Sequence, residues 1–149
     1  MAIAPQKLRE IIFLLIYSYD FSEPDEADIT AMLMQELAVS KTVMRLAHEK
    51  KKQIQEKLTE IDLIITEYSE SYDFERIPRV ERNILRLGLY ELLFSSNIPS
   101  KVAIAEAIRL TRKFATSQAA SFVNAILDAI YQNQEKKREE IPDAIPLSV

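Results

Sequence analysis

Cysteine is absent from the 149-residue sequence, and glycine and histidine each occur once. Without cysteine the chain has no disulfide framework, thiol nucleophile or zinc ribbon, and nothing requires an oxidising compartment. We therefore expect it in the cytoplasm. Because hairpin turns and bulges depend on glycine, a single glycine argues against a β-rich fold. These absences predict an all-α protein.

Long hydrophobic runs are also missing. No apolar run approaches the roughly 18 residues that span a bilayer, so we expect no membrane anchor. The run at 11–17 follows Lys7 and Arg9 and superficially resembles a secretion signal. However, Glu10 interrupts the basic flank, and no small-x-small cleavage site follows. With 48% apolar and 28% charged residues, the chain has the composition of a folded globular domain.

Groups for catalysis are scarce. The sequence shows no nucleophile beside a base, no spaced metal ligands and no glycine-rich phosphate loop. The only histidine, His48, stands beside Glu49 and a run of lysines, and we interpret it as a solvated surface residue. We expect no enzyme, no cofactor and no metal site.

Apolar residues recur at helical spacing through most of the chain. The pattern predicts six to seven helices, with Ser40 and Thr116 as N-caps, and Gly88 at a close helix crossing. The predicted helices cover residues 6–20, 26–38, 40–72, 78–94, 101–115 and 117–133. We place a first lobe at 1–72, a second at 78–134 and a frayed tail at 135–149 of one domain.

Charge is unevenly distributed around the net value of −4. Residues 23–38 carry five acids and no bases, whereas 76–114 carry eight bases and three acids. Arg82 and Arg86 continue a series of arginines at three- and four-residue steps, predicted to lie along an exposed helix flank. Such a row is either a solvated face or a binding site for a phosphate backbone. Lys113 would widen the patch.

Two aromatic residues flank the junction "ATSQAAS" between the last two predicted helices. Phe114 and Phe122 either plug the core or stack on unpaired bases. The helical spacing of Phe122 favours the core interpretation more strongly.

Three segments in order, "RVERNILRLGLYELL", "IPSKVAIAEAIRLTRKF" and "SFVNAILDAI", resemble the bacterial transcription antitermination factor NusB family. The start "LREIIFLLIYSYDFS" is similar as well. The resemblance implies two small helical bundles packed together. It also implies pairing with ribosomal protein S10 (NusE), binding of boxA RNA, and assembly with NusA, NusG and RNA polymerase to suppress termination in ribosomal RNA operons.

The resemblance also implies roles for specific residues. It implies that Glu81 faces NusE. It also implies RNA contacts at Lys7, Arg9, Tyr17, Arg82, Arg86, Lys113, Phe114, Gln118 and Phe122.

Two departures stand out. The chain starts with "QKLRE" where the family has several arginines, and Gln118 replaces an acid that many relatives carry. An alternative is therefore a helical interaction module or homodimer with weak or lost RNA binding. A NusB-like module of an RNA cytosine methyltransferase is a third class, but the chain leaves no residues for a cofactor-binding fold.

Overall fold

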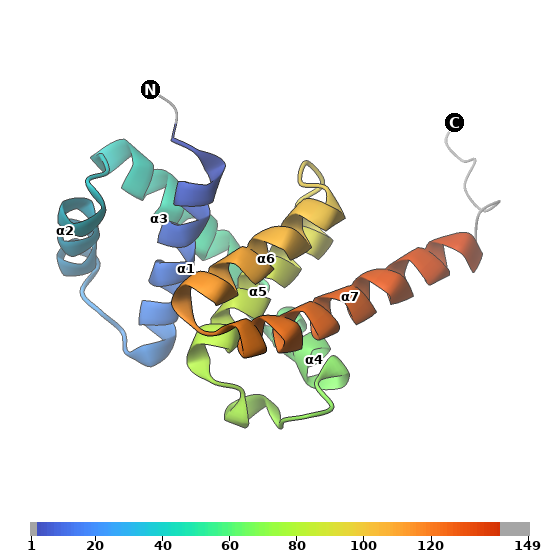
Figure 1. Cartoon of the computed structure of the whole chain (residues 1–149). Coiled ribbons are helices and arrows are strands. Elements are labelled where there is room, and N and C mark those ends of the chain that lie inside the picture. The colour runs from blue at the N-terminus through green and yellow to red at the C-terminus, as the bar shows by residue number, and fades with distance from the viewer. Residues whose placement is uncertain (1–2, 141–149) are drawn as a thin grey trace, which may run out of the picture.

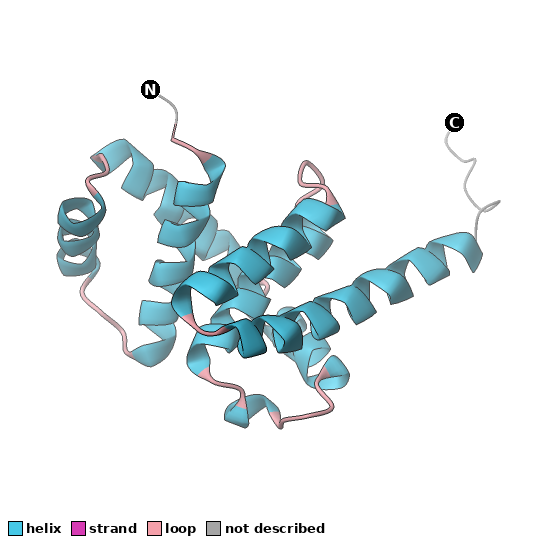
Figure 2. Cartoon of the chain, viewed as in Figure 1, coloured by secondary structure: helices cyan, strands magenta, loops and turns pink. Residues whose placement is uncertain are grey.

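The computed structural model describes residues 3–140, and within them every regular element is helical (Figure 1, Figure 2). The all-α prediction is confirmed. The elements are α1 (Pro5–Phe21), α2 (Glu26–Leu37), α3 (Lys41–Glu56), α4 (Leu58–Tyr68), the short 3-10 turn η1 (Phe74–Arg76), α5 (Arg79–Phe94), α6 (Ser100–Phe114) and α7 (Ser117–Glu140).

Polar side chains start several helices. Ser40 Oγ accepts a hydrogen bond from the Val43 backbone N–H at 3.2 Å, and Thr116 Oγ1 accepts one from Ala119 at 3.0 Å. Asp25 caps α2 in the same way. Each bond satisfies an N–H that the first helical turn leaves without a partner. Both predicted N-caps are confirmed.

Helix α1 is central. It packs against α3 on one side and α5 on the other, and Ile11, Phe13 and Leu15 are almost completely buried. Because apolar side chains cover more than one face of this helix, it needs partners on several sides. The run that superficially resembles a secretion signal is therefore part of the core.

The predicted helix over 40–72 is wrong in its continuity. The chain leaves helical geometry at Lys57, where φ is −108° and ψ is 5°, and it resumes as α4 at Leu58. The Lys57 N–H bonds to the Ile54 carbonyl at 2.9 Å, three residues back, so the last turn is tightened. Ile54 and Ile61 on either side are both buried. The apolar residues therefore keep their helical spacing across the break, and the sequence pattern does not reveal it.

The break also changes the packing partners. Helix α4 packs on α5 and α7, whereas α2 and α3 lie on the α1 side of the molecule (Figure 1). The helices therefore change neighbours at Lys57, ahead of the lobe boundary that we predicted at 73–78.

Gly88 lies where α5 crosses α6 and α7. A Cβ atom there would lie 3.1 Å from Leu127 Cδ1 and 3.3 Å from Ala107 Cβ. These distances are tighter than ordinary contacts between carbon atoms. The predicted close crossing is confirmed.

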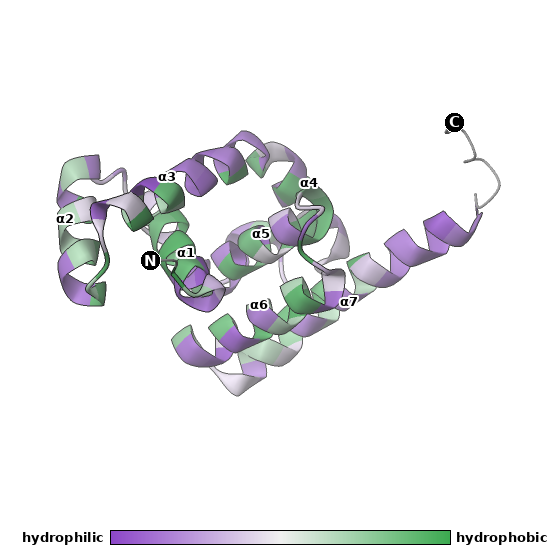
Figure 3. Ribbon diagram, turned by 90° about the horizontal axis from the view of Figure 1, so that it is seen from above, coloured by the Kyte–Doolittle hydropathy of each residue, from purple (hydrophilic) through white to green (hydrophobic). Residues whose placement is uncertain are grey.

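Helix α7 is longer than expected. It continues to Glu140, so the predicted frayed tail is helical over 135–140, and the rest of that tail lies outside the described residues. The last turns of α7 are hydrophilic and project from the body of the molecule (Figure 3).

Candidate nucleic-acid interface

Helices α1 and α6 lie side by side and are joined by polar contacts along their length. Gln6 Nε2 donates to Glu106 Oε2 at 3.2 Å, and Arg109 Nη1 donates to Glu10 Oε2 at 2.7 Å. Farther along, the Phe13 and Phe114 rings lie 4.9 Å apart between centroids. This seam brings the predicted amino-terminal contacts next to those at the end of α6.

Arg9 lies inside this seam. Its Nε donates to both carboxylate oxygens of Glu91, at 3.0 and 2.8 Å, and its Nη1 to Glu106 Oε1 at 3.3 Å. Only 8% of the residue is exposed. The guanidinium is enclosed and already paired with two carboxylates, which leaves little of it for an RNA contact, and the RNA contact at Arg9 stays an untested prediction.

The carboxylates of the seam differ in pKa. Burial raises the pKa of Glu91, and Arg9 offsets only part of that effect. Burial also acts to raise the pKa of Glu106, but the hydrogen bonds from Arg109 and Gln6 outweigh it, and the pKa is lowered.

Lys7 and Lys113 are the exposed cations of the predicted set. Lys113 Nζ donates to Glu10 Oε1 at 2.8 Å and lies 5.7 Å from the centroid of the Phe114 ring. Burial acts to raise the pKa of Glu10, yet the hydrogen bonds from Lys113 and Arg109 prevail and lower it. Within residues 3–140, Lys7 makes no ion pair.

Aromatic side chains continue from the seam. The Phe13 ring contacts Tyr17, with centroids 5.8 Å apart, as well as Phe114. Tyr17 and Phe114 are half-buried. Sequence reasoning missed Phe13, although its four-residue spacing from Tyr17 places the two rings on one helix face.

The α6–α7 junction holds the remaining predicted contacts. Gln118 is exposed in the first turn of α7. Phe122 is half-buried and meets Tyr72 edge to face, with ring centroids 5.4 Å apart. Neither Phe114 nor Phe122 is a fully buried core residue, so each leaves part of its ring at the surface.

Arg82 and Arg86 are not on an exposed flank. They are 9% and 7% exposed, and their guanidinium groups lie 2.8 and 3.3 Å from the Asp20 carboxylate. Arg86 also donates to both oxygens of Asp62, at 2.9 Å each. Phe74 lies within cation–π distance of both arginines. The predicted exposed flank is therefore wrong for these two arginines, and their phosphate-binding role stays an untested prediction.

The two carboxylates in this cluster come from α1 and α4. Asp20 stands 62 positions before Arg82, and Asp62 stands 24 before Arg86. The sequence offers no local spacing that would pair residues so far apart. The buried pairs join α1 and α4 to α5.

Glu81, the acid expected to face NusE, is half-buried in the first turn of α5. Burial raises its pKa, and a hydrogen bond with its own backbone offsets part of that effect. Glu81 forms no ion pair with any residue within 3–140. Its contact with NusE stays a prediction.

His48 is not a solvated surface residue. Its Nε2 lies 2.8 Å from Thr30 Oγ1, and its Nδ1 is buried without a hydrogen-bond partner. Lys51 is also buried, and its Nζ lies 3.8 Å from the Tyr19 ring centroid. These contacts join α2 to α3, and α3 to the end of α1.

Residues 3–140 contain no group of histidines and carboxylates placed to hold a metal ion. None of the helices in this range is long and apolar enough to cross a membrane.

Comparison with known proteins identifies relatives of this chain. The sequence model of the NusB family matches residues 6–132. Transcription antitermination protein NusB of Chlamydia pneumoniae is 40% identical over 126 residues, which cover 85% of this chain and 79% of that protein. The same protein of Geobacter sulfurreducens is 36% identical over 123 residues, covering 82% and 89%.

Solved structures agree. T. maritima NusB superposes with a TM-score of 0.74 at 32% identity, covering 89% of this chain and 93% of that one. A chain from the crystal structure of antitermination factors NusB and NusE in complex with dsRNA gives 0.73 at 28% identity, covering 86% and 96%. The relatives are antitermination proteins, in agreement with the expectation that the chain is not an enzyme. The family match, the sequence identity and the fold together show that the chain belongs to the NusB family.

Proposed function

We propose that the protein is a transcription antitermination factor that pairs with NusE, ribosomal protein S10, and binds boxA-type RNA. In this role it suppresses termination in ribosomal RNA operons, within an RNA polymerase complex that contains NusA and NusG. The observation that carries the proposal is the match in fold and sequence to a NusB chain crystallised with NusE and dsRNA.

The proposed RNA surface is smaller than the sequence alone predicts. It keeps the exposed Lys7, Lys113 and Gln118 and the half-buried rings of Tyr17, Phe114 and Phe122. The lysines supply charge for phosphates, and the rings supply faces on which unpaired bases stack. Arg9, Arg82 and Arg86 are left out because they are buried as well as paired with carboxylates, whereas Lys113 is exposed.

The proposed NusE surface includes Glu81, in the first turn of α5. A half-buried carboxylate without an ion pair is suited to a cation from a partner protein, because the partner would recover the solvation that burial has removed.

The test is an anisotropy titration of labelled boxA RNA, with and without NusE, over a range of salt concentrations. Three phosphate contacts, from Lys7, Lys113 and the neighbouring exposed Arg112, give a slope of log K against log salt of roughly −2, whereas six give about −4. The smaller slope supports the proposed surface. Equal affinity for boxA and scrambled RNA in both conditions would refute RNA recognition.

The burial of three predicted RNA-binding arginines favours a second candidate, a helical interaction module or homodimer with weak or lost RNA binding. Light scattering during size exclusion measures the oligomeric state, and the same titration measures RNA binding. A stable dimer that binds NusE but shows no salt-dependent RNA binding would favour this candidate.

A further inference from the structure

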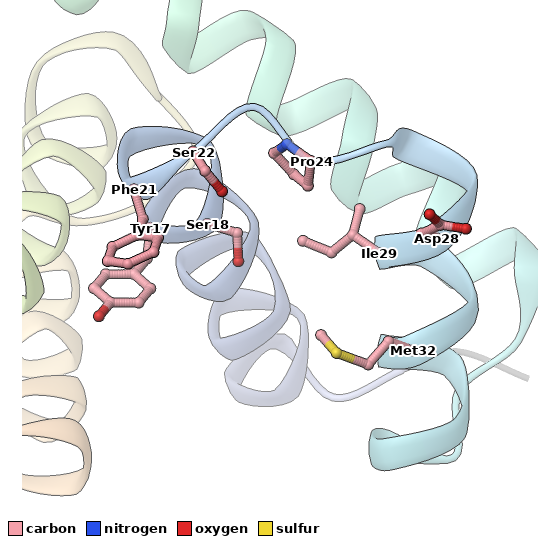
Figure 4. Close-up of a pocket in the computed structure, with 8 residues that line it drawn as sticks. All are labelled: Tyr17, Ser18, Phe21, Ser22, Pro24, Asp28, Ile29 and Met32. Carbon is pink, nitrogen blue, oxygen red and sulfur yellow. The ribbon is translucent and has the colours of Figure 1, made fainter.

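A pocket of about 490 Å³ lies between α1, α3 and α5, beside the loop that joins α5 to α6. Volumes of this size are typical of small-molecule sites. Pro5, Pro99 and Val102 are exposed lining residues, so the pocket opens to solvent beside them. A smaller groove of about 390 Å³ lies between the end of α1 and α2 (Figure 4), and no residue lines both.

The lining of the pocket is mostly apolar. Ile12 and Leu87 are buried, while Leu8 and Ile98 are half-buried. Apolar walls allow a ligand to remove its own hydrocarbon surface from water. The pocket can therefore hold an apolar body of modest size.

Three charged residues also line the pocket. Arg9 and Glu91 neutralise each other, because Arg9 Nε donates to both oxygens of Glu91. Lys50 is the third, and it forms no ion pair with any residue in the described range 3–140. The lining therefore has one positive charge that no carboxylate balances.

Lys50 is directed toward the pocket by its neighbours. Its Nζ lies 5.9 Å from the ring centroid of Tyr90, which also lines the pocket. Burial raises the pKa of Glu91, and the charges of Arg9 and Lys50 oppose that effect. Lys50 is therefore close enough to act on the buried pair, although it is itself only half-buried.

We propose that this pocket binds a small apolar carboxylate, a compound with one carboxylate on an aromatic or branched hydrocarbon body. The carboxylate pairs with Lys50 Nζ, and the hydrocarbon body lies against Leu8 and Ile12. The charge-assisted hydrogen bond orients the ligand, and apolar burial supplies most of the affinity. None of the residues assigned above to RNA or NusE lines the pocket, so the site depends on neither proposed surface.

The charges and the lining disfavour other ligands. A cationic ligand would be repelled by Lys50, and Arg9 already occupies the Glu91 carboxylate. A phosphate backbone is bound by several cations together, whereas this pocket offers one cation among apolar walls.

The test compares three compounds that share one ring system: naphthoate, naphthalene methanol and naphthalene methylammonium. Their charges are negative, neutral and positive. Binding is followed by NMR of protein labelled at the isoleucine methyl groups. Ile12 and Ile98 report on the pocket, and Ile29 in the groove between α1 and α2 is the remote reference (Figure 4).

We expect naphthoate to shift the Ile12 and Ile98 signals saturably and to leave Ile29 unchanged. Naphthalene methanol should bind about tenfold more weakly, because it lacks the charge that pairs with Lys50. The methylammonium compound should bind more weakly still.

Variants test the charge and the opening separately. Lys50→Met keeps an apolar stem and should weaken naphthoate about tenfold without changing the affinity of the neutral alcohol. Lys52→Met, at an exposed position of the same helix, is its control and should change neither.

Val102→Trp should fill the opening and weaken naphthoate and the alcohol alike, by about tenfold. Its control is Leu63→Trp on α4, where Leu63 is 67% exposed. Neither compound should lose affinity for this control. Circular dichroism should show all four variants folded.

Three results would overturn the inference. The first is the absence of a saturable shift at Ile12 and Ile98. The second is equal naphthoate affinity of wild type and Lys50→Met, which would show that Lys50 does not hold the carboxylate. The third is displacement of naphthoate by boxA RNA, which would make the pocket part of the RNA surface and leave the proposed function intact. A failure of boxA RNA to bind, with naphthoate binding as expected, would contradict the proposed function alone.

Discussion

Arg9 Nε of α1 lies 2.8 Å from Glu91 Oε2 of α5, and both residues are buried although 82 positions separate them in the sequence. Because Glu106 of α6 also accepts from Arg9, the guanidinium ties three helices together. A cation in the expected RNA-binding arm thus has a structural role, whereas the neighbouring Lys7 is exposed and makes no ion pair within residues 3–140.

Arg9→Ala should lower the free energy of unfolding by about 3–5 kcal/mol. The reason is that Glu91 and Glu106 would remain buried without their shared cation. Urea denaturation measures the change. Lys7→Ala, two positions earlier and exposed, should stay within about 0.5 kcal/mol of wild type. Equal stability of the two variants would show that the buried pair contributes nothing.

Asp20 should make the protein sensitive to acid. Burial acts to raise the pKa of Asp20, but hydrogen bonds from Arg82 and Asn83 and the charge of Arg86 lower it overall. A carboxyl group with a lowered pKa stabilises the fold above its ordinary value of about 3.9, and this stabilisation is lost as pH falls through the folded-state pKa.

Asp20→Asn should therefore flatten the fall in unfolding free energy below about pH 4. It should also lower stability at neutral pH, because Arg82 loses its carboxylate. Denaturation curves collected across this pH range test both effects. Asp128→Asn, at an exposed position of α7, is the control and should keep the wild-type slope. A wild-type slope in Asp20→Asn would contradict the expected linkage.

His48 should contribute a second pH dependence, closer to neutrality. Burial lowers the pKa of His48, nearby Lys51 lowers it further, and Glu26 acts in the opposite direction. Because the folded protein binds this proton more weakly than the unfolded chain does, stability should fall as pH drops below about 6.5.

His48→Gln should remove that dependence while keeping a polar group within reach of Thr30 Oγ1. Melting temperatures between pH 7.5 and 5.5, a range around the ordinary histidine pKa of about 6.5, provide the measurement. If His48→Gln loses stability toward pH 5.5 as steeply as wild type, another group is responsible.

Local features of the sequence predicted local features of the fold. Ser40 and Thr116 start helices as expected, since a cap needs only neighbouring residues. The scarcity of glycine led to the correct fold class. Gly88 indicated a close helix crossing because a glycine inside a helix needs a compensating contact.

The sequence did not predict which side chains pair between helices that are far apart in the chain. Arg82 and Arg86 have the spacing of an exposed basic row, but Asp20 and Asp62 make them buried partners. Likewise His48 stands in a polar stretch yet meets Thr30 of another helix. In each case the sequence shows which residues are charged or polar. Whether such a side chain is buried depends on which distant helix supplies its partner.

Gly88→Val should destabilise the protein by about 1–3 kcal/mol, because even one Cβ would crowd Leu127 and Ala107. Combining it with Leu127→Ala should cost less than the sum of the two single changes, since the smaller side chain makes room for valine. Urea denaturation of the four proteins gives the coupling energy. Strict additivity would show that Leu127 is not the side chain that the valine meets.

Gln118→Glu should separate RNA binding from stability. Position 118 is in the first turn of α7, where an acid interacts favourably with the helix dipole, so stability should rise by about 0.3–1 kcal/mol. A phosphate about 4 Å away would be repelled by about 1 kcal/mol in water, which weakens RNA binding about fivefold. Anisotropy and thermal melting measure the two effects. Gln132→Glu, the same change at an exposed position of the same helix, should leave RNA affinity unchanged. If the two variants bind boxA RNA equally well, Gln118 lies outside the RNA surface.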